Sequence, residues 1–111
     1  MLNRDSILNF EDITTEEVKV PEWGGVLKVK TMTGIERQNY YKSLADKTDQ
    51  KSVMAALTVA CAVDDEGNHI FKAEDIIDLS KKSAIPLTRI FEKAASLNGL
   101  TQKAVDDLAG E

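Results

Sequence analysis

Few side chains in this sequence have the chemistry for catalysis, and none has the partners that the chemistry needs. Cys61 is the single cysteine, and small apolar residues surround it over residues 59–63. His69 is the single histidine. A catalytic thiol requires a base beside it, and a zinc site requires several Cys or His ligands. We therefore expect Cys61 to be a buried structural thiol, and we expect no enzyme activity, no metal and no cofactor.

An acidic loop over residues 64–71 has the oxygen content of a calcium site but the wrong spacing. In an EF-hand loop glycine occupies position 6, so Gly67 would place Ala62, which has no ligand oxygen, at position 1. The composition favours a polar turn with Gly67 at positive φ and with Ile70 and Phe71 returning to the core. His69 is expected to be exposed or bonded within this turn.

Three aromatic side chains are the candidates for binding another protein. Trp and Tyr are common anchors of protein interfaces because they combine a large apolar area with a polar group. Trp23 lies in a Trp-Gly-Gly turn, where it either fills the space between hairpin and helices or contacts a partner. Tyr40 and Tyr41 are adjacent in a predicted helix and cannot both point inward. One of the two is therefore expected in the core and the other at a partner-binding surface.

Composition limits the class of protein further. The 111 residues, 42% of them hydrophobic, suit one compact domain, and the net charge of -5 argues against a nucleic-acid partner. No apolar stretch approaches the roughly 20 residues that cross a bilayer, and the first residues lack the pattern of a secretion signal. We expect no membrane partner and a cytoplasmic location.

The N-terminal part predicts an arm followed by a hairpin. Residues 1–16 are polar except around Ile7, Leu8 and Phe10, and predict a partly ordered arm, either a docked helical turn or a frayed segment. Residues 17–20 and 26–32 alternate between apolar and polar, which indicates two strands of a hairpin at about residues 17–32. Gly24 and Gly25 between them are expected to supply positive φ angles. The apolar side of the hairpin must then be covered by helices or by another subunit, and its edge is a template for self-association.

The remaining sequence, within a single domain over residues 17–111, predicts about four to five helices. Thr33 and Glu36 form a capping box that begins a helix over residues 34–47. The second, central helix begins at Asp49 or Ser52, reaches residue 63 and carries a stripe of inward residues: Val53, Ala56, Leu57, Ala60 and Cys61. The others are a short helix over residues 74–79, one with Pro86 in its first turn that stops at Asn98-Gly99, and a last one over residues 101–109. The fold class is therefore α+β and mainly α, with a short N-terminal β-hairpin.

Several of these segments together resemble the tail assembly chaperones of long-tailed, siphovirus-type bacteriophages. The resemblance begins in residues 18–37, where a Val-x-Val-Pro-x-Trp-Gly-Gly turn precedes an alternating strand and a Thr-Gly helix start. It continues in Asp-Glu-Gly-Asn-His-Ile-Phe at residues 65–71, in Glu74-Asp75, and in residues 95–105. The similarity extends over roughly residues 15–108.

The resemblance implies a role in phage tail assembly. Members of that family bind the tape measure protein and keep it soluble until the tail tube protein polymerises around it, and they are absent from the mature virion. A longer form made by translational frameshifting often helps to recruit the tube subunit. The resemblance thus implies two protein partners, a homo-oligomer and a place in the host cytoplasm.

The alternative from the residues alone is a small helical regulatory or DNA-associated domain. Its last two helices would form a helix-turn-helix around Asn98-Gly99. The would-be recognition helix over residues 102–109 carries one lysine against Asp106 and Asp107, and these acids would face DNA phosphates. The charge pattern therefore favours the chaperone.

Overall fold

The predicted hairpin is present and gains a third strand. In the computed structural model, which describes residues 1–45 and 52–100, strand β1 (Thr15–Val20) pairs antiparallel with β2 (Gly25–Lys30). Strand β2 pairs in turn with β3 (Ala62–Val63), so the strand order is β1-β2-β3. Val18 and Val20 of β1 and Val29 of β2 are buried, which gives the sheet one apolar face.

The reversal between β1 and β2 is a short 3-10 turn over Pro21–Trp23. Gly24 ends it with φ +79°, a left-handed angle that glycine adopts without strain. Gly25 already belongs to β2 and has no positive φ, so the prediction of a second left-handed glycine was wrong. One left-handed residue is sufficient here because the 3-10 turn carries out the rest of the reversal.

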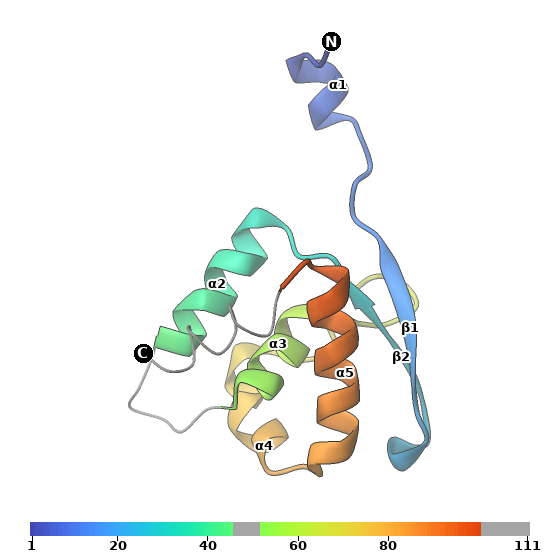
Figure 1. Ribbon diagram of the computed structural model, residues 1–111, viewed down its shortest axis with the longest axis vertical. Coiled ribbons are helices and arrows are strands. Elements are labelled where there is room, and N and C mark those ends of the chain that lie inside the picture. The colour runs from blue at the N-terminus through green and yellow to red at the C-terminus, as the bar shows by residue number, and fades with distance from the viewer. Residues whose placement is uncertain (46–51, 101–111) are drawn as a thin grey trace.

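Within the described residues, four helices form the body beside the sheet (Figure 1): α2 (Gly34–Ala45), α3 (Val53–Cys61), α4 (Ile76–Ser80) and α5 (Ala84–Leu97). The Thr33 hydroxyl accepts from the Glu36 amide at 3.1 Å, and a Glu36 carboxylate oxygen accepts from the Thr33 amide at 2.8 Å, so the predicted capping box is formed. Ser52 caps α3. Together with the sheet, these helices confirm an α+β, mainly α fold.

Helix α3 is the centre of the core, as predicted, but its buried face differs from the predicted stripe. Residues 55–58 and Cys61 are buried, whereas Val53 and Ala60 are only partly buried. Val53 and Ala60 still pack against the core, and Ala55 and Thr58 are buried in addition because α3 contacts α2, α4 and α5 as well as β2. A helix with neighbours on several sides buries consecutive residues, including the polar Thr58, rather than one stripe.

The predicted extension of this helix to residue 63 was also wrong. Helix α3 ends at Cys61, and the next two residues form β3, where Lys28 faces Val63 and Val29 faces Ala62. A two-residue strand has no periodicity of its own, so the apolar Ala62 and Val63 resembled a continuation of the helix.

The N-terminal arm contains a short helix, α1 (Arg4–Leu8), capped by Asn3. Residues 1–17 are all exposed, and Figure 1 shows the arm projecting beyond the body from the start of β1. The predicted last helix, over residues 101–109, and the predicted helix boundaries at residues 47 and 49 lie outside the described residues. No helix of the described part is both long enough and apolar enough to span a bilayer.

Candidate functional site

The Cys61 thiol is held in the core rather than at a reactive surface. Its side chain is completely buried, and its Sγ lies 3.6 Å from the Asn98 side-chain nitrogen. Burial raises the pKa of Cys61 to about 12. Since the thiolate is the nucleophilic form, this thiol is inert at neutral pH.

His69 is exposed, the first of the two predicted alternatives, and it reaches across to helix α2 rather than bonding within its own turn. Its imidazole hydrogen-bonds to Glu36, whose other carboxylate oxygen accepts from Lys30 Nζ at 2.7 Å. Partial burial by itself would raise the pKa of Glu36, but the hydrogen bonds from Lys30, Thr33 and His69 outweigh it and lower the pKa to about 2. Glu36 is therefore a charged link between β2, α2 and the loop, with its oxygens already occupied.

The acidic loop is a turn, as predicted, but the predicted return of Ile70 to the core was wrong: Ile70 is 44% exposed, and only Phe71 is partly buried. Asp64 Oδ1 accepts from the backbone amides of Glu66 and Asn68 at 2.9 and 3.0 Å, and Gly67 has φ +85°. The Asp64 carboxylate thus satisfies the backbone of its own loop. Over residues 1–45 and 52–100, no three His, Cys, Asp or Glu side chains converge on a point where a metal ion would bind.

Trp23 lies at the edge of an apolar groove. The groove has a volume of about 360 Å³ and is lined by Trp23, Phe71, Leu79 and Lys82. Trp23 is 38% exposed, while Leu79 is buried and Phe71 is partly buried. The ring therefore contacts the body without being enclosed by it, and the groove beside it is open to another apolar side chain.

The two adjacent tyrosines separate into a buried and an exposed ring. Tyr40 is 2% exposed, and its hydroxyl has no hydrogen-bond partner among residues 1–45 and 52–100. Burial raises the pKa of Tyr40 to about 12. Tyr41 is 38% exposed, and its ring centroid lies 5.7 Å from that of Tyr40. Tyr40 is thus a core residue that no partner contacts in this conformation, and Tyr41 is the accessible member of the pair.

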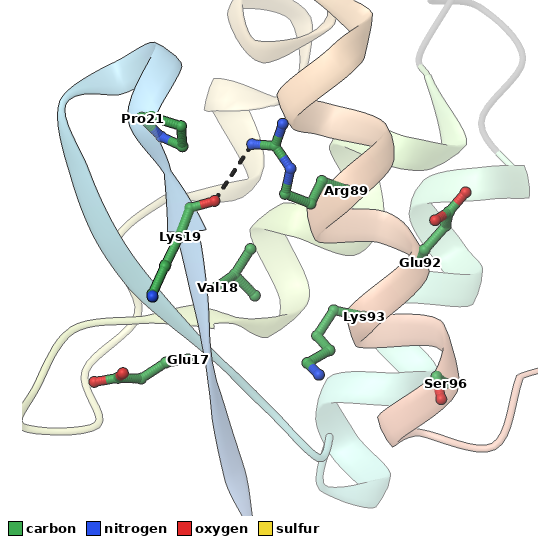
Figure 2. A pocket seen from close by; sticks show the side chains of 8 residues that line it. All are labelled: Glu17, Val18, Lys19, Pro21, Arg89, Glu92, Lys93 and Ser96. Carbon is green, nitrogen blue, oxygen red and sulfur yellow. Dashed lines mark hydrogen bonds between the residues drawn. The ribbon is translucent and has the colours of Figure 1, made fainter.

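A larger groove of about 760 Å³ runs between β1 and α5 (Figure 2). Val18 and Pro21 supply its apolar surface, and Arg89 and Lys93 line it from α5. Arg89 Nη1 donates to the Lys19 carbonyl at 3.3 Å, the bond drawn in Figure 2. Arg89 Nη1 and Nη2 each donate to one Glu22 carboxylate oxygen at 2.7 Å. This two-bond fork lowers the pKa of Glu22 to about 2. The charge pattern did not single out this groove, because its two sides are about 70 residues apart in the sequence.

Comparison with known proteins is informative at the level of solved structures. No known protein family profile matches the sequence, and no curated protein is significantly similar to it. Among solved structures, the chain is similar to the tail assembly chaperone of bacteriophage HK97, with a TM-score of 0.60 and 14% sequence identity. The match covers 85% of this chain and 89% of the other. At this identity the similarity demonstrates a common fold over nearly all of both chains.

Proposed function

Because the chain has the fold of a phage tail assembly chaperone, we propose that it binds the tape measure protein and keeps it soluble during tail assembly. The shared fold carries this proposal, since it extends over 85% of the chain and agrees with the independent resemblance of the sequence motifs. The binding is through apolar contact, and it takes place in the host cytoplasm. The chain leaves as the tube forms and is absent from the mature virion.

The groove beside Trp23 has the character that such a client needs. A tape measure chain is long and helical, and before assembly its apolar side chains are exposed to water. Trp23, Phe71 and Leu79 provide an apolar groove for such a side chain, and Lys82 at the rim is available to a client carboxylate. Tyr41 adds an exposed aromatic surface on α2. We propose that Trp23 and Tyr41 contact the client, and that Tyr40 supports Tyr41 from the core.

Charge explains how a small protein keeps a much larger client in solution. The chain carries a net charge of -5. Several copies bound along one tape measure therefore cover apolar surface and give the complex a negative charge that opposes aggregation. We propose that the tail tube protein is recruited next, through the longer frameshifted form that the resemblance implies.

Co-expression with the tape measure protein of the same genome tests this proposal. The parent chain is expected to raise the soluble fraction of the client, and Trp23→Ala to lower that fraction several-fold because the aromatic anchor is lost. Tyr41→Ala is expected to act in the same direction. Ile85→Ala is the matched control, because Ile85 is an exposed aliphatic residue (66%) in the first turn of α5, outside the Trp23 groove.

Circular dichroism must show that each variant is folded at the expression temperature. An unchanged client solubility with the parent chain would contradict the chaperone function. Equal losses of client solubility with Trp23→Ala and Ile85→Ala would contradict the proposal that the Trp23 groove binds the client. They would not contradict the chaperone function.

A further inference from the structure

The N-terminal arm exposes most of its large apolar side chains to water. Five of its large side chains are between 44% and 77% exposed: Leu2, Ile7, Leu8, Phe10 and Ile13. Helix α1 has only five residues, far fewer than the roughly 12 that an isolated helix needs in water. Figure 1 shows the connection from α1 to β1 continuing approximately along the strand, away from the body. The arm therefore has the properties of a segment that docks on another surface.

Strand β1 offers such a surface along its outer edge. Within the described residues β1 pairs with β2 alone. The Thr31 amide donates to the Thr14 carbonyl, so the backbone groups of Thr14 point towards β2. In an antiparallel pair the direction of these groups alternates along the strand, so the backbone groups that point away from β2 belong to Thr15, Glu17 and Lys19. The bond from Arg89 to the Lys19 carbonyl has this outward direction. These backbone groups can bind a further strand, with the 760 Å³ groove beside them.

The arm and β1 are complementary to each other when two copies of the chain meet. Suppose that residues 10–20 of two copies pair antiparallel with Thr15 opposite Thr15. Each residue whose backbone groups point away from β2 then lies opposite a residue of the same kind in the other copy, as strand hydrogen bonding requires. Glu11 then lies opposite Lys19, which is an attractive pair on the outer face of the sheet. Phe10 lies opposite the buried Val20 and therefore points towards the helices. Asp12 lies opposite Val18, on the face where Lys93 lines the groove.

Neighbouring registers are less favourable. Centring the pair on Thr14 brings Glu11 opposite Glu17, a repulsive pair of like charges. Centring it on Glu16 places Ile13 opposite Lys19 and leaves Glu11 beyond Val20, outside the strand. The charges thus select the register that is centred on Thr15.

We propose that two copies of this chain exchange their N-terminal arms, so that residues 10–13 of each copy add a strand to the free edge of β1 in the other. Phe10 enters the groove between β1 and α5, and the Lys19 carbonyl takes a backbone partner in place of Arg89. Arg89 keeps its fork on Glu22. The proposal deepens the self-association that the resemblance implies, and it requires no client, so it stands or falls independently of the chaperone assay.

Disulfide trapping tests the register in the purified chain. Under oxidised glutathione, Thr15→Cys is expected to give a covalent dimer on a non-reducing gel, because two residues facing each other in an antiparallel pair lie within disulfide range. Glu17→Cys is the matched control, since Glu17 faces Ile13 in this register. The native Cys61 is buried in both variants. A covalent dimer of Glu17→Cys, or none of Thr15→Cys, would overturn the register.

A charge exchange tests the interface without any crosslink. Glu11→Lys is expected to weaken dimerisation by about tenfold in sedimentation equilibrium, because two repulsive pairs replace two attractive ones. Adding Lys19→Glu is expected to restore the parent constant. A monomeric parent chain at high concentration, including one whose arm folds back on its own β1, would overturn the exchange. So would a double variant as weak as Glu11→Lys.

Discussion

At the scale of single residues, the side chain of Asn98 has the most hydrogen-bond partners among the residues that the structure describes. Its Oδ1 accepts from the Met32 amide at 2.7 Å, and its Nδ2 donates to the carbonyls of Lys30 and Ala94 at 3.1 and 2.9 Å. Its backbone carbonyl accepts from Arg37 at 2.7 Å. The sequence predicted Asn98 only as a helix stop, because nothing local indicates partners more than 60 residues away. One residue therefore joins the end of α5 to β2 and α2.

Replacing Asn98 tests this role. Asn98→Ala is expected to lower the free energy of unfolding by about 2–4 kcal/mol, because the Met32 amide and the Lys30 carbonyl lose their partner in a partly buried place. Urea denaturation measures the change. Gln38→Ala, which removes an exposed amide from α2, is the control and should alter stability by less than about 0.5 kcal/mol. Similar midpoints for the two variants would contradict the role of Asn98.

At the scale of elements, the start of α2 combines a predicted local signal with contacts that no local pattern indicates. The Thr33–Glu36 capping box depends on residues three apart, and it was predicted and found. The bonds of Glu36 to Lys30 and His69 depend on how β2 and the 64–71 loop pack against α2. Glu36 thus holds three elements together through its negative charge.

The low pKa of Glu36 makes this junction sensitive to acid. Its pKa is lowered from 4.5 to about 2 in the folded chain. Between those values the unfolded chain binds the proton more readily, so the contribution of Glu36 is complete above pH 4.5 and is lost as the pH falls towards 2. We expect the stability difference between parent and Glu36→Gln to shrink by about 1–2 kcal/mol over this range, after allowing for solvent screening.

Chemical denaturation at pH 6, 4 and 2.5 measures this difference. Glu92→Gln is the control, because Glu92 is an exposed carboxylate of α5 that takes no part in the Glu36 junction. A parent-minus-Glu36→Gln difference that stays constant from pH 6 to 2.5 would show that Glu36 does not carry the acid dependence.

At the scale of the whole molecule, charge separates the chaperone from the DNA-associated alternative. The net charge is -5, and in the described residues the cations Lys30, Arg89 and Lys93 are paired with Glu36, Glu22 and Glu16. The helix that would enter the DNA groove lies outside the described residues. The net negative charge therefore disfavours the DNA-associated alternative.

Binding to duplex DNA provides the corresponding measurement. Fluorescence anisotropy with a labelled duplex is expected to show no saturable binding at micromolar protein, at either 50 or 200 mM salt, because the net charge of -5 repels phosphates. A basic DNA-binding domain of similar size serves as the positive control. A micromolar affinity that falls steeply between the two salt concentrations would favour the regulatory function.

The sequence by itself determined the features that depend on neighbouring residues. The hairpin, the Thr33 capping box, the left-handed Gly24 and Gly67, and the buried surroundings of Cys61 all follow from signals within a few positions of the chain. The same signals identified Trp23 as a candidate, either packed between hairpin and helices or in contact with a partner, without revealing the groove beside it.

Only the tertiary structure decided the features that depend on distant segments. It selected Tyr40 rather than Tyr41 for the core, formed β3 at the end of α3, and brought Arg89 to Glu22 across 67 positions. In the described part of one chain it also left residues 1–13 exposed and the outer edge of β1 without a further strand. The physical reason is that helix caps and turns are satisfied within a few residues. The burial of a ring or the pairing of an edge depends on which surfaces the packed elements present to one another.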